Sequence, residues 1–333
     1  MDKVTTTGNQ ANRNGADVLV DTLLANQVDV CFANPGTSEM HFVAALDRKP
    51  QMRCVLGLFE GVVTGAADGY ARMADKPACT LLHTGPGLAN ALANMHNARR
   101  ANTPMVNIVG DHASYHLHHD APLTSDIESL ARPMSKWVGR VRNASEVAQQ
   151  AAEAIHASTT LGGGVTTLIL PADAAWSETS AAPVIAQPPQ TLALDDHALR
   201  RSVEALQSKS DGKTLLLLSG RALREDALAI AQSIAERTGA HLLAQQSNAR
   251  TQRGQGRVAI ERVPYNVDAA LKLLARYKRV ILIGAKAPVA FFAYPGKPGS
   301  MLPADADIIH LSPLGGDVLA ALQQLASATG ASS

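Results

Sequence analysis

Residues 54–72 form the stretch that most constrains what this chain can fold into. The stretch opens as a short apolar run, which is typical of a buried strand. It then changes to small and apolar residues at the spacing of one helix face, and these are Val63, Ala66, Ala67, Tyr70 and Ala74. The sequence therefore predicts a strand whose carboxyl end leads directly into a helix that begins at Glu60.

The residues around Glu60 leave two interpretations open. A glutamate in the first turn of a helix is favoured by the helix dipole and can simply cap the helix. Alternatively, Leu58, Phe59 and Val62 would desolvate the carboxylate and raise its pKa, as in a functional site. The neighbouring small residues would then leave room for another backbone or a flat ring, and these are Gly57, Gly61, Gly65, Ala66 and Ala67.

Length and composition indicate a globular protein of about two domains. The chain has 333 residues, of which 46% are hydrophobic and 18% are charged, so it has ample material for a core. A formal net charge of +1 and an aromatic fraction of 4% argue against nucleic-acid binding, because neither a basic surface nor stacking platforms are present.

The three cysteines and the N-terminal residues bear on the cellular compartment. Cys31, Cys54 and Cys79 lie in apolar strand-like runs without C-x-x-C spacing, which predicts buried free thiols rather than a disulfide or metal site. Residues 1–14 lack the apolar region of a signal peptide, and no apolar segment approaches the roughly 18–20 residues of a membrane span. We therefore expect a cytoplasmic protein without membrane contact.

Strand-like and helix-like segments alternate through the first half of the chain. Strands are predicted at 28–33, 53–59, 77–82, 104–109 and 165–170, and helices at 15–26, 60–74, 88–100 and 147–157. This alternation predicts an α/β fold with a doubly wound parallel sheet that the segment 165–170 closes. Ligands bind at the carboxyl ends of such strands, where Asn34, Glu60, His83 and Gly110 are expected to gather.

The rest of the chain predicts a linker and a second α/β domain. Residues 110–137 contain four histidines, His112, His116, His118 and His119. These residues are expected to form a mobile, solvated loop. The alternative is a metal site, but no cluster of Cys or carboxylate ligands accompanies the histidines. Prolines mark residues 179–195 as a linker between domains at 12–178 and 196–327. In the second domain, strands are predicted at 214–219, 241–244, 280–283 and 308–311, and helices at 225–238, 267–277 and 317–326. Residues 285–302 suit either a loop covering the domain or a subunit contact.

Four ordered blocks resemble thiamine diphosphate enzymes of the group that contains acetolactate synthase, benzoylformate decarboxylase and pyruvate decarboxylase. Residues 60–72 resemble the E-x-x-A-x-x-x-A-x-G-Y-A-R segment, and the resemblance continues in residues 34–39, 83–87 and 167–173. It implies a pyrimidine-binding domain followed by a Rossmann-like central domain. It also implies an enzyme, a lyase or transferase, that acts on a small 2-oxo acid as a homo-oligomer.

The resemblance assigns roles to individual residues. Glu60 would share a proton with atom N1′ of the cofactor's aminopyrimidine ring, and His83 matches the catalytic histidine of benzoylformate decarboxylase. The other matching positions, near the active centre or around the pyrimidine, are Pro35, Gly36, Thr37, Thr84, Gly87 and Asn90. His118 and His119 are weaker candidates, by similarity to a substrate-facing pair in pyruvate decarboxylase. The alternative for His83 is a histidine that is merely satisfied at a strand end.

The blocks mix two patterns, so carboligation and decarboxylation both remain open. Residues 85–87 are similar to acetolactate synthase, whereas residues 34–37 and His83 are similar to benzoylformate decarboxylase. The family binds Mg²⁺ and the diphosphate through Gly-Asp-Gly and a later Asn-Asn, and no Gly-Asp-Gly occurs in this sequence. Acetolactate synthase carries a flavin on its central domain, but Gly254-Gln255-Gly256 lacks the third glycine of a dinucleotide motif, so FAD is unsupported.

The missing motif allows two expectations for the chain as a whole. Either a third domain with the Mg²⁺ site is supplied by a partner chain, or the chain is a truncated remnant without activity that acts through a dimerisation surface. In the first case, this chain would bind only the pyrimidine half of thiamine diphosphate and would carry no metal site of its own.

Overall fold

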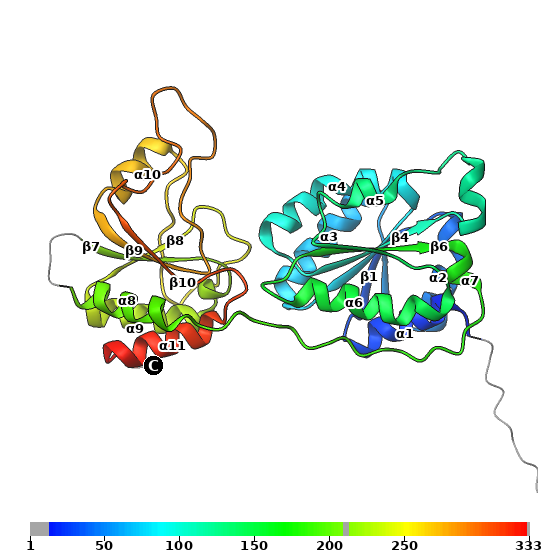
Figure 1. Ribbon diagram of the computed structural model, residues 1–333, viewed down its shortest axis with the longest axis horizontal. Coiled ribbons are helices and arrows are strands. Elements are labelled where there is room, and N and C mark those ends of the chain that lie inside the picture. The colour runs from blue at the N-terminus through cyan, green and yellow to red at the C-terminus, as the bar shows by residue number, and fades with distance from the viewer. Residues whose placement is uncertain (1–12, 209–212, 332–333) are drawn as a thin grey trace, which may run out of the picture. The chain divides into compact units, whose positions relative to one another are not determined.

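The computed structural model describes residues 13–208 and 213–331. It divides the chain into two compact units, residues 1–189 and 190–333, each built on a parallel sheet with helices on both faces (Figure 1). The predicted α/β class with two mainly parallel sheets is confirmed. The boundary between the units lies within residues 179–195. No helix of the described residues is both long and apolar enough to cross a membrane.

The first unit contains a six-stranded sheet in the order β2-β1-β3-β4-β6-β5, and all pairs are parallel. The strands are β1 (Val30–Asn34), β2 (Arg53–Leu56), β3 (Ala78–Leu82), β4 (Met105–Asp111), β5 (Trp137–Arg140) and β6 (Val165–Pro171). The prediction that residues 165–170 close the sheet is wrong, because β5 pairs with the outer side of β6. Strand β5 has only four residues, all half-buried, and therefore lacks the apolar run that marks an inner strand.

Helices cover the two faces of this sheet separately (Figure 1). One face packs against α1 (Gly15–Ala25), α2 (Met40–Arg48), α6 (Val147–Thr159) and α7 (Ala172–Trp176), and the other against α3 (Glu60–Ala74), α4 (Thr84–Ala101) and α5 (Ile127–Ala131). Successive strand residues alternate between these two cores, so that Cys31 belongs to one and Phe32 to the other. A strand that is covered on both faces is buried throughout, as β3 is.

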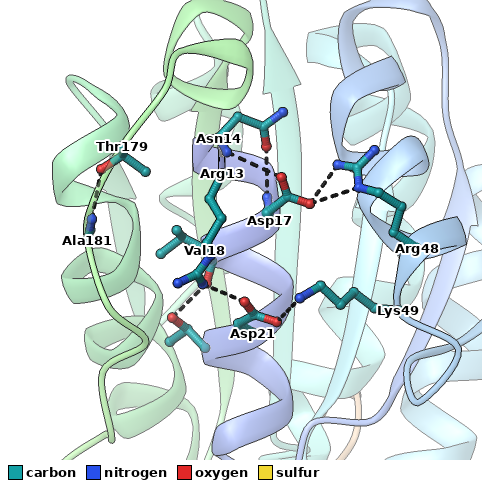
Figure 2. Close-up of polar contacts among 10 residues, drawn as sticks. Arg13, Asn14, Asp17, Val18, Asp21, Arg48, Lys49, Thr179 and Ala181 are labelled. Carbon is teal, nitrogen blue, oxygen red and sulfur yellow. Dashed lines mark hydrogen bonds and ion pairs between the residues drawn. The ribbon is translucent and has the colours of Figure 1, made fainter. Parts of the chain in front are cut away.

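Charged side chains fix the N-terminus of α1 (Figure 2). Asn14 and Asp17 form a capping box, in which each side chain accepts a hydrogen bond from the other residue's backbone N–H. Asp17 also pairs with Arg48 at the end of α2, at 2.6 Å, and Asp21 pairs with Lys49 at 2.6 Å. These ion pairs join α1 to the C-terminal end of α2.

Much of the segment predicted to be a linker lies along the first unit. Residues 179–187 have no regular secondary structure, yet Thr179 N donates to Arg13 O at 2.9 Å and Ala186 N donates to Asn26 Oδ1 at 2.8 Å. The prolines of this stretch prevent a helix but not such backbone anchoring. Residues 179–187 of the predicted linker are therefore anchored to the first unit by hydrogen bonds.

The second unit contains a four-stranded parallel sheet in the order β10-β9-β7-β8. Its strands are β7 (Lys213–Leu218), β8 (His241–Ala244), β9 (Tyr277–Ile283) and β10 (Asp307–Ser312). Helices α8 (Asp196–Gln207), α9 (Glu225–Thr238) and α11 (Val318–Thr329) cover one face, and α10 (Val267–Leu274) lies on the other (Figure 1). Helix α8 was not predicted. Tyr277, predicted to end a helix, instead begins β9, where it is buried with its hydroxyl 3.1 Å from His241 Nδ1.

The cysteines differ in exposure. Cys31 and Cys79 are buried free thiols, as predicted, but Cys54 is exposed. The reason is the position of β2 at the edge of the sheet, where an apolar run is not covered on both sides. The prediction that all three thiols are buried is therefore wrong at Cys54.

Candidate active site

The carboxyl ends of four neighbouring parallel strands carry the candidate site of the first unit. Asn34 ends β1, Glu60 follows β2 after a short turn, His83 follows β3, and Asp111 ends β4, next to Gly110. Because β2, β1, β3 and β4 are consecutive in the sheet, these positions lie along one edge, as predicted. Asn34 Nδ2 donates to Gly57 O at 2.8 Å and so joins the ends of β1 and β2.

Glu60 is the first residue of α3 and is 7% exposed. Its Oε2 accepts a hydrogen bond from Asn90 Nδ2 of α4 at 3.0 Å. The predicted cause of its burial is wrong, because the neighbouring apolar side chains point to solvent: Leu58 is 90% exposed, Phe59 48% and Val62 59%. Helix α4, rather than these neighbours, covers the carboxylate.

Helix α4 begins at Thr84, four residues earlier than predicted, and so brings Gly87 against Glu60. Pro86 fits in the first turn because the first backbone N–H groups of a helix have no partner within the helix. A Cβ atom on Gly87 would stand 2.7 Å from Glu60 Oε1 and 3.4 Å from His83 Cβ. Glu60 and His83 therefore flank the same glycine, and any side chain there would press on the carboxylate.

Thr84 holds an unusual backbone conformation at the centre of this site. Its φ of +50° lies in the left-handed region, which β-branched residues rarely adopt and which costs about 1–3 kcal/mol. The residue is fully buried, and its hydroxyl has no hydrogen-bond partner among the described residues. Strained backbone clusters at functional sites. A catalytic role is one of the explanations for a buried hydroxyl without a partner.

His83 is paired with a residue that we did not single out from the sequence. Its Nδ1 lies 2.8 Å from Oε2 of Glu39, whose side chain is 1% exposed against 25% for that of His83. A Cβ on Gly36 would stand 2.2 Å from His83 Cε1, so the ring lies directly over this glycine. The spacing Gly36-x-x-Glu39 of a capping box was the available signal, since Glu39 also accepts a hydrogen bond from Gly36 N.

The remaining predicted site residues are placed less centrally. Pro35 and Gly36 are half-buried, and Thr37 is exposed at the start of the short 3₁₀ helix Thr37–Glu39. Within the described part of the chain, no hydrogen bond joins Pro35 or Thr37 to Glu60 or His83. The structure thus brings together Gly36, His83, Gly87, Asn90 and Glu60, and leaves Pro35 and Thr37 on the rim.

Three of the four histidines of residues 110–119 lie on a short helix after β4, and the fourth, His112, is half-buried directly after Asp111. His116, His118 and His119 are exposed on the 3₁₀ helix Ser114–His119, and the rings of His118 and His119 are 3.8 Å apart between centroids. No hydrogen bond or ring contact joins them to Glu60 or His83 in the described residues. The described residues also contain no group of three or more His, Cys, Asp or Glu side chains that could hold a metal ion.

Comparisons with known proteins agree with the fold and the site. Residues 13–130 match the family model "Thiamine pyrophosphate enzyme, N-terminal TPP binding domain". The chain is 49% identical over 311 residues to "Putative acetolactate synthase large subunit IlvX" of Mycobacterium tuberculosis, covering 93% of this chain and 59% of that protein. It is 27% identical over 289 residues to benzoylformate decarboxylase of Pseudomonas aeruginosa, covering 84% of this chain and 53% of that protein.

A solved structure from Mycobacterium smegmatis, described as a "putative thiamin diphosphate-dependent enzyme", superposes with a TM-score of 0.82 at 25% identity, over 96% of this chain and 63% of that one. The chain thus spans less than two thirds of the length of these relatives. Its four sequence blocks, its sheet topology and these matches give one result. Residues 13–130 form an N-terminal TPP binding domain of the thiamine pyrophosphate enzymes, and the chain is a homologue of acetolactate synthase large subunits and benzoylformate decarboxylases.

Proposed function

We propose that the first unit holds the aminopyrimidine ring of thiamine diphosphate against Glu60, in a reaction that decarboxylates a 2-oxo acid or joins it to a second one. The observation that carries this proposal is the buried Glu60 carboxylate. Asn90 binds its Oε2, while its Oε1 faces the position where Gly87 has no side chain.

The residues present fit the pyrimidine end of the cofactor. A buried carboxylate at a helix N-terminus can hold a proton toward a ring nitrogen, and the glycine beside it leaves room for a flat ring. When bound, thiamine diphosphate supplies the electron sink for cleavage beside the substrate carbonyl. Glu60 would hold or release a proton at Oε1, Asn90 would orient the carboxylate, and His83 would exchange a proton with the substrate.

We further propose that the Mg²⁺ and diphosphate site comes from polypeptide outside these 333 residues. The sequence contains no Gly-Asp-Gly, and no group of ligands suited to a metal lies in the described residues. Mg²⁺ bound to a diphosphate needs one or two protein carboxylates at its octahedral site. A separate chain that supplies them would complete the cofactor site, and the activity would then belong to the assembly.

Exposed apolar side chains beside Glu60 support an assembly. Five residues of β2, α3 and the turn between them are exposed and form what we name the β2–α3 patch: Leu56, Leu58, Phe59, Val62 and Met73, at 67%, 90%, 48%, 59% and 66% exposure. Groups of exposed apolar side chains often mark sites of protein–protein interaction. We propose that a second copy of this chain covers the patch and closes the solvent side of the Glu60 site.

The second candidate function is an inactive remnant that acts only through this surface. The β2–α3 patch favours it, because association through the patch needs neither Glu60 nor His83. The strained backbone of Thr84 and the buried carboxylates of Glu39 and Glu60 favour the enzyme instead. A surface that serves only for association would gain nothing from the strain or from the buried charges.

A fusion protein distinguishes the two candidates. The chain would be joined to the C-terminal remainder of the Mycobacterium tuberculosis relative, which we call the fusion enzyme, and supplied with thiamine diphosphate and Mg²⁺. Turnover of pyruvate or benzoylformate that disappears in the Glu60→Gln variant is the expected result. If the fusion enzyme binds the cofactor but turns over neither acid, so that it does not differ from its Glu60→Gln variant, the result would support the remnant.

A further inference from the structure

Glu39 has a deeply buried side chain at the site, 1% exposed, and one of its oxygens binds two partners. Its Oε2 lies 2.8 Å from Gly36 N and 2.8 Å from His83 Nδ1. Its Oε1 is buried without a hydrogen-bond partner among the described residues. A Cβ on Gly110 would stand 1.7 Å from this Oε1, so the carboxylate lies tightly over the end of β4.

The two partners of Oε2 determine where the histidine proton resides. The backbone N–H of Gly36 is always a donor, and an ionised carboxylate only accepts hydrogen bonds. Oε2 of Glu39 already accepts a hydrogen bond from Gly36 N, so it also faces His83 as an acceptor, and the hydrogen between Glu39 and His83 is on the ring. Nδ1 of His83 therefore carries a hydrogen, and in the neutral ring the lone pair is on Nε2.

Two glycines keep this pair in one geometry. Gly36 lies under the imidazole ring of His83, and Gly110 lies against the Glu39 carboxylate. These close approaches confine the carboxylate on the side of Gly110 and the ring on the side of Gly36. Burying a carboxylate with one unpaired oxygen reduces stability, so this arrangement has no advantage for the fold alone.

We infer that Glu39 is a positioning residue that fixes His83 as the Nδ1–H tautomer and leaves Nε2 as the nitrogen that exchanges a proton with the substrate. This inference rests on the function proposed above for the same site. Glu39 acts only through His83 and touches neither the cofactor nor the substrate. His83 Nε2 has no partner in the described residues, as a nitrogen that meets an external molecule requires.

The tautomer can be measured in the 333-residue chain without cofactor. Long-range ¹H–¹⁵N spectra of the ¹⁵N-labelled protein distinguish Nδ1–H from Nε2–H rings, and a His83→Gln variant assigns the signal. We expect the Nδ1–H form for neutral His83 in the unaltered chain. In the Glu39→Ala variant, the signal should move to the Nε2–H form or to a mixture.

The same spectra contain the control for folding. His156 of α6 in the first unit, whose Nδ1 is 2.9 Å from Gln187 O, should keep its signal in every folded variant. A His83 ring in the Nε2–H form in the unaltered chain would overturn the inference. The inference would also be overturned if the folded Glu39→Ala variant kept His83 in the Nδ1–H form. If Glu39→Ala unfolds the first unit, the tautomer of His83 in the unaltered chain alone decides whether the inference stands.

Kinetics of the fusion enzyme test the same inference independently. His83→Ala should slow turnover by about 10²–10⁴-fold, and Glu39→Ala by about 10–100-fold, as for other carboxylates that orient a functional histidine. The double variant should be no slower than His83→Ala alone, because Glu39 acts through His83. If the double variant were slowed by the product of the two single effects, the positioning role of Glu39 would be overturned. If the fusion enzyme has no activity at all, the proposed function fails, whereas the tautomer result still decides the inference about Glu39.

Discussion

The side-chain amide of Asn90 donates to the carboxylate of Glu60 across the interface of α4 and α3, with 3.0 Å between Nδ2 and Oε2. A second bond joins the same helices one turn further along, from Asn94 Nδ2 to Gly61 O at 2.6 Å. Glu60 is therefore held by two packed helices rather than by a loop. Functional groups on rigid elements are positioned more accurately than groups on loops, which suits a carboxylate that must meet one ring nitrogen.

Replacing Glu60 by glutamine tests its role in activating the cofactor. Glutamine retains an oxygen that accepts from Asn90, but it cannot exchange a proton with the pyrimidine ring. In the fusion enzyme, we expect exchange of the cofactor's C2 proton to slow by orders of magnitude, while the melting temperature changes little. Exchange is followed by NMR after mixing with D₂O and quenching with acid. An unchanged exchange rate would remove Glu60 from the mechanism.

Replacing His83 by alanine should separate proton transfer to the substrate from activation of the cofactor. Turnover of a 2-oxo acid by the fusion enzyme is expected to slow by about 10²–10⁴-fold, the effect of losing one acid–base group. Exchange of the C2 proton should be spared, because Glu60 governs that step. His96→Ala is the matched control, since this exposed histidine of α4 has no assigned role at the site and should leave both rates unchanged. If His83→Ala also leaves both unchanged, His83 is structural.

The sequence predicted most of the fold, because buried parallel strands and amphipathic helices have clear periods. Helices α3 and α9 begin and end at the predicted residues. The errors have physical causes that a sequence pattern does not contain. Strand β5 is short and only half-buried, and Tyr277 has the composition of a helix end but is buried as the start of β9. Strand β2 is as apolar as an inner strand, and its edge position depends on the topology.

The candidate site was predicted in part. Glu60 and His83 were placed correctly at the strand ends, because strand-to-helix transitions are visible in the sequence. The contact of Gly87 with Glu60 was not visible, since it depends on α4 beginning at Thr84 in a left-handed conformation. Glu39 was missed as a partner of His83 because the two residues are 44 positions apart and belong to different strand ends.

Cys54 should be accessible but slow to react. Partial burial of its thiol, with a smaller contribution from the neighbouring Cys31, raises the pKa of Cys54 to about 11 from the ordinary 9.0. The thiolate is the reactive form, so at pH 8 its fraction is lower by about 100-fold than for an ordinary cysteine. Alkylation by iodoacetamide, followed by mass spectrometry, should modify Cys54 faster as the pH rises from 8 to 10. Buried Cys31 and Cys79 should stay unmodified, and their labelling ahead of Cys54 would contradict the edge position of β2.

Val62→Asp tests whether the β2–α3 patch joins two copies of the chain. Val62 is 59% exposed in the middle of the patch, and a buried unpaired carboxylate there would strongly disfavour association. We expect the unaltered chain to sediment as a dimer or larger assembly and the variant as a monomer. Ile185→Asp is the matched control, since Ile185 is 66% exposed on the first unit outside the patch. Equal sedimentation of all three proteins would show that the patch is not the interface.

The 333-residue chain should not bind thiamine diphosphate usefully on its own. Most of the cofactor's charge is on the diphosphate, and the sequence has neither Gly-Asp-Gly nor a metal-binding group among its described residues. The pyrimidine contacts that remain are one charge-assisted hydrogen bond and some apolar burial, each worth about 1–3 kcal/mol. Association itself costs several kcal/mol, so at most a millimolar affinity remains. Titration calorimetry with thiamine diphosphate and Mg²⁺ measures this affinity, with the fusion enzyme as the positive control. A micromolar dissociation constant for the chain alone would mean that it contains a diphosphate site of its own, and the proposed need for outside polypeptide would then be wrong.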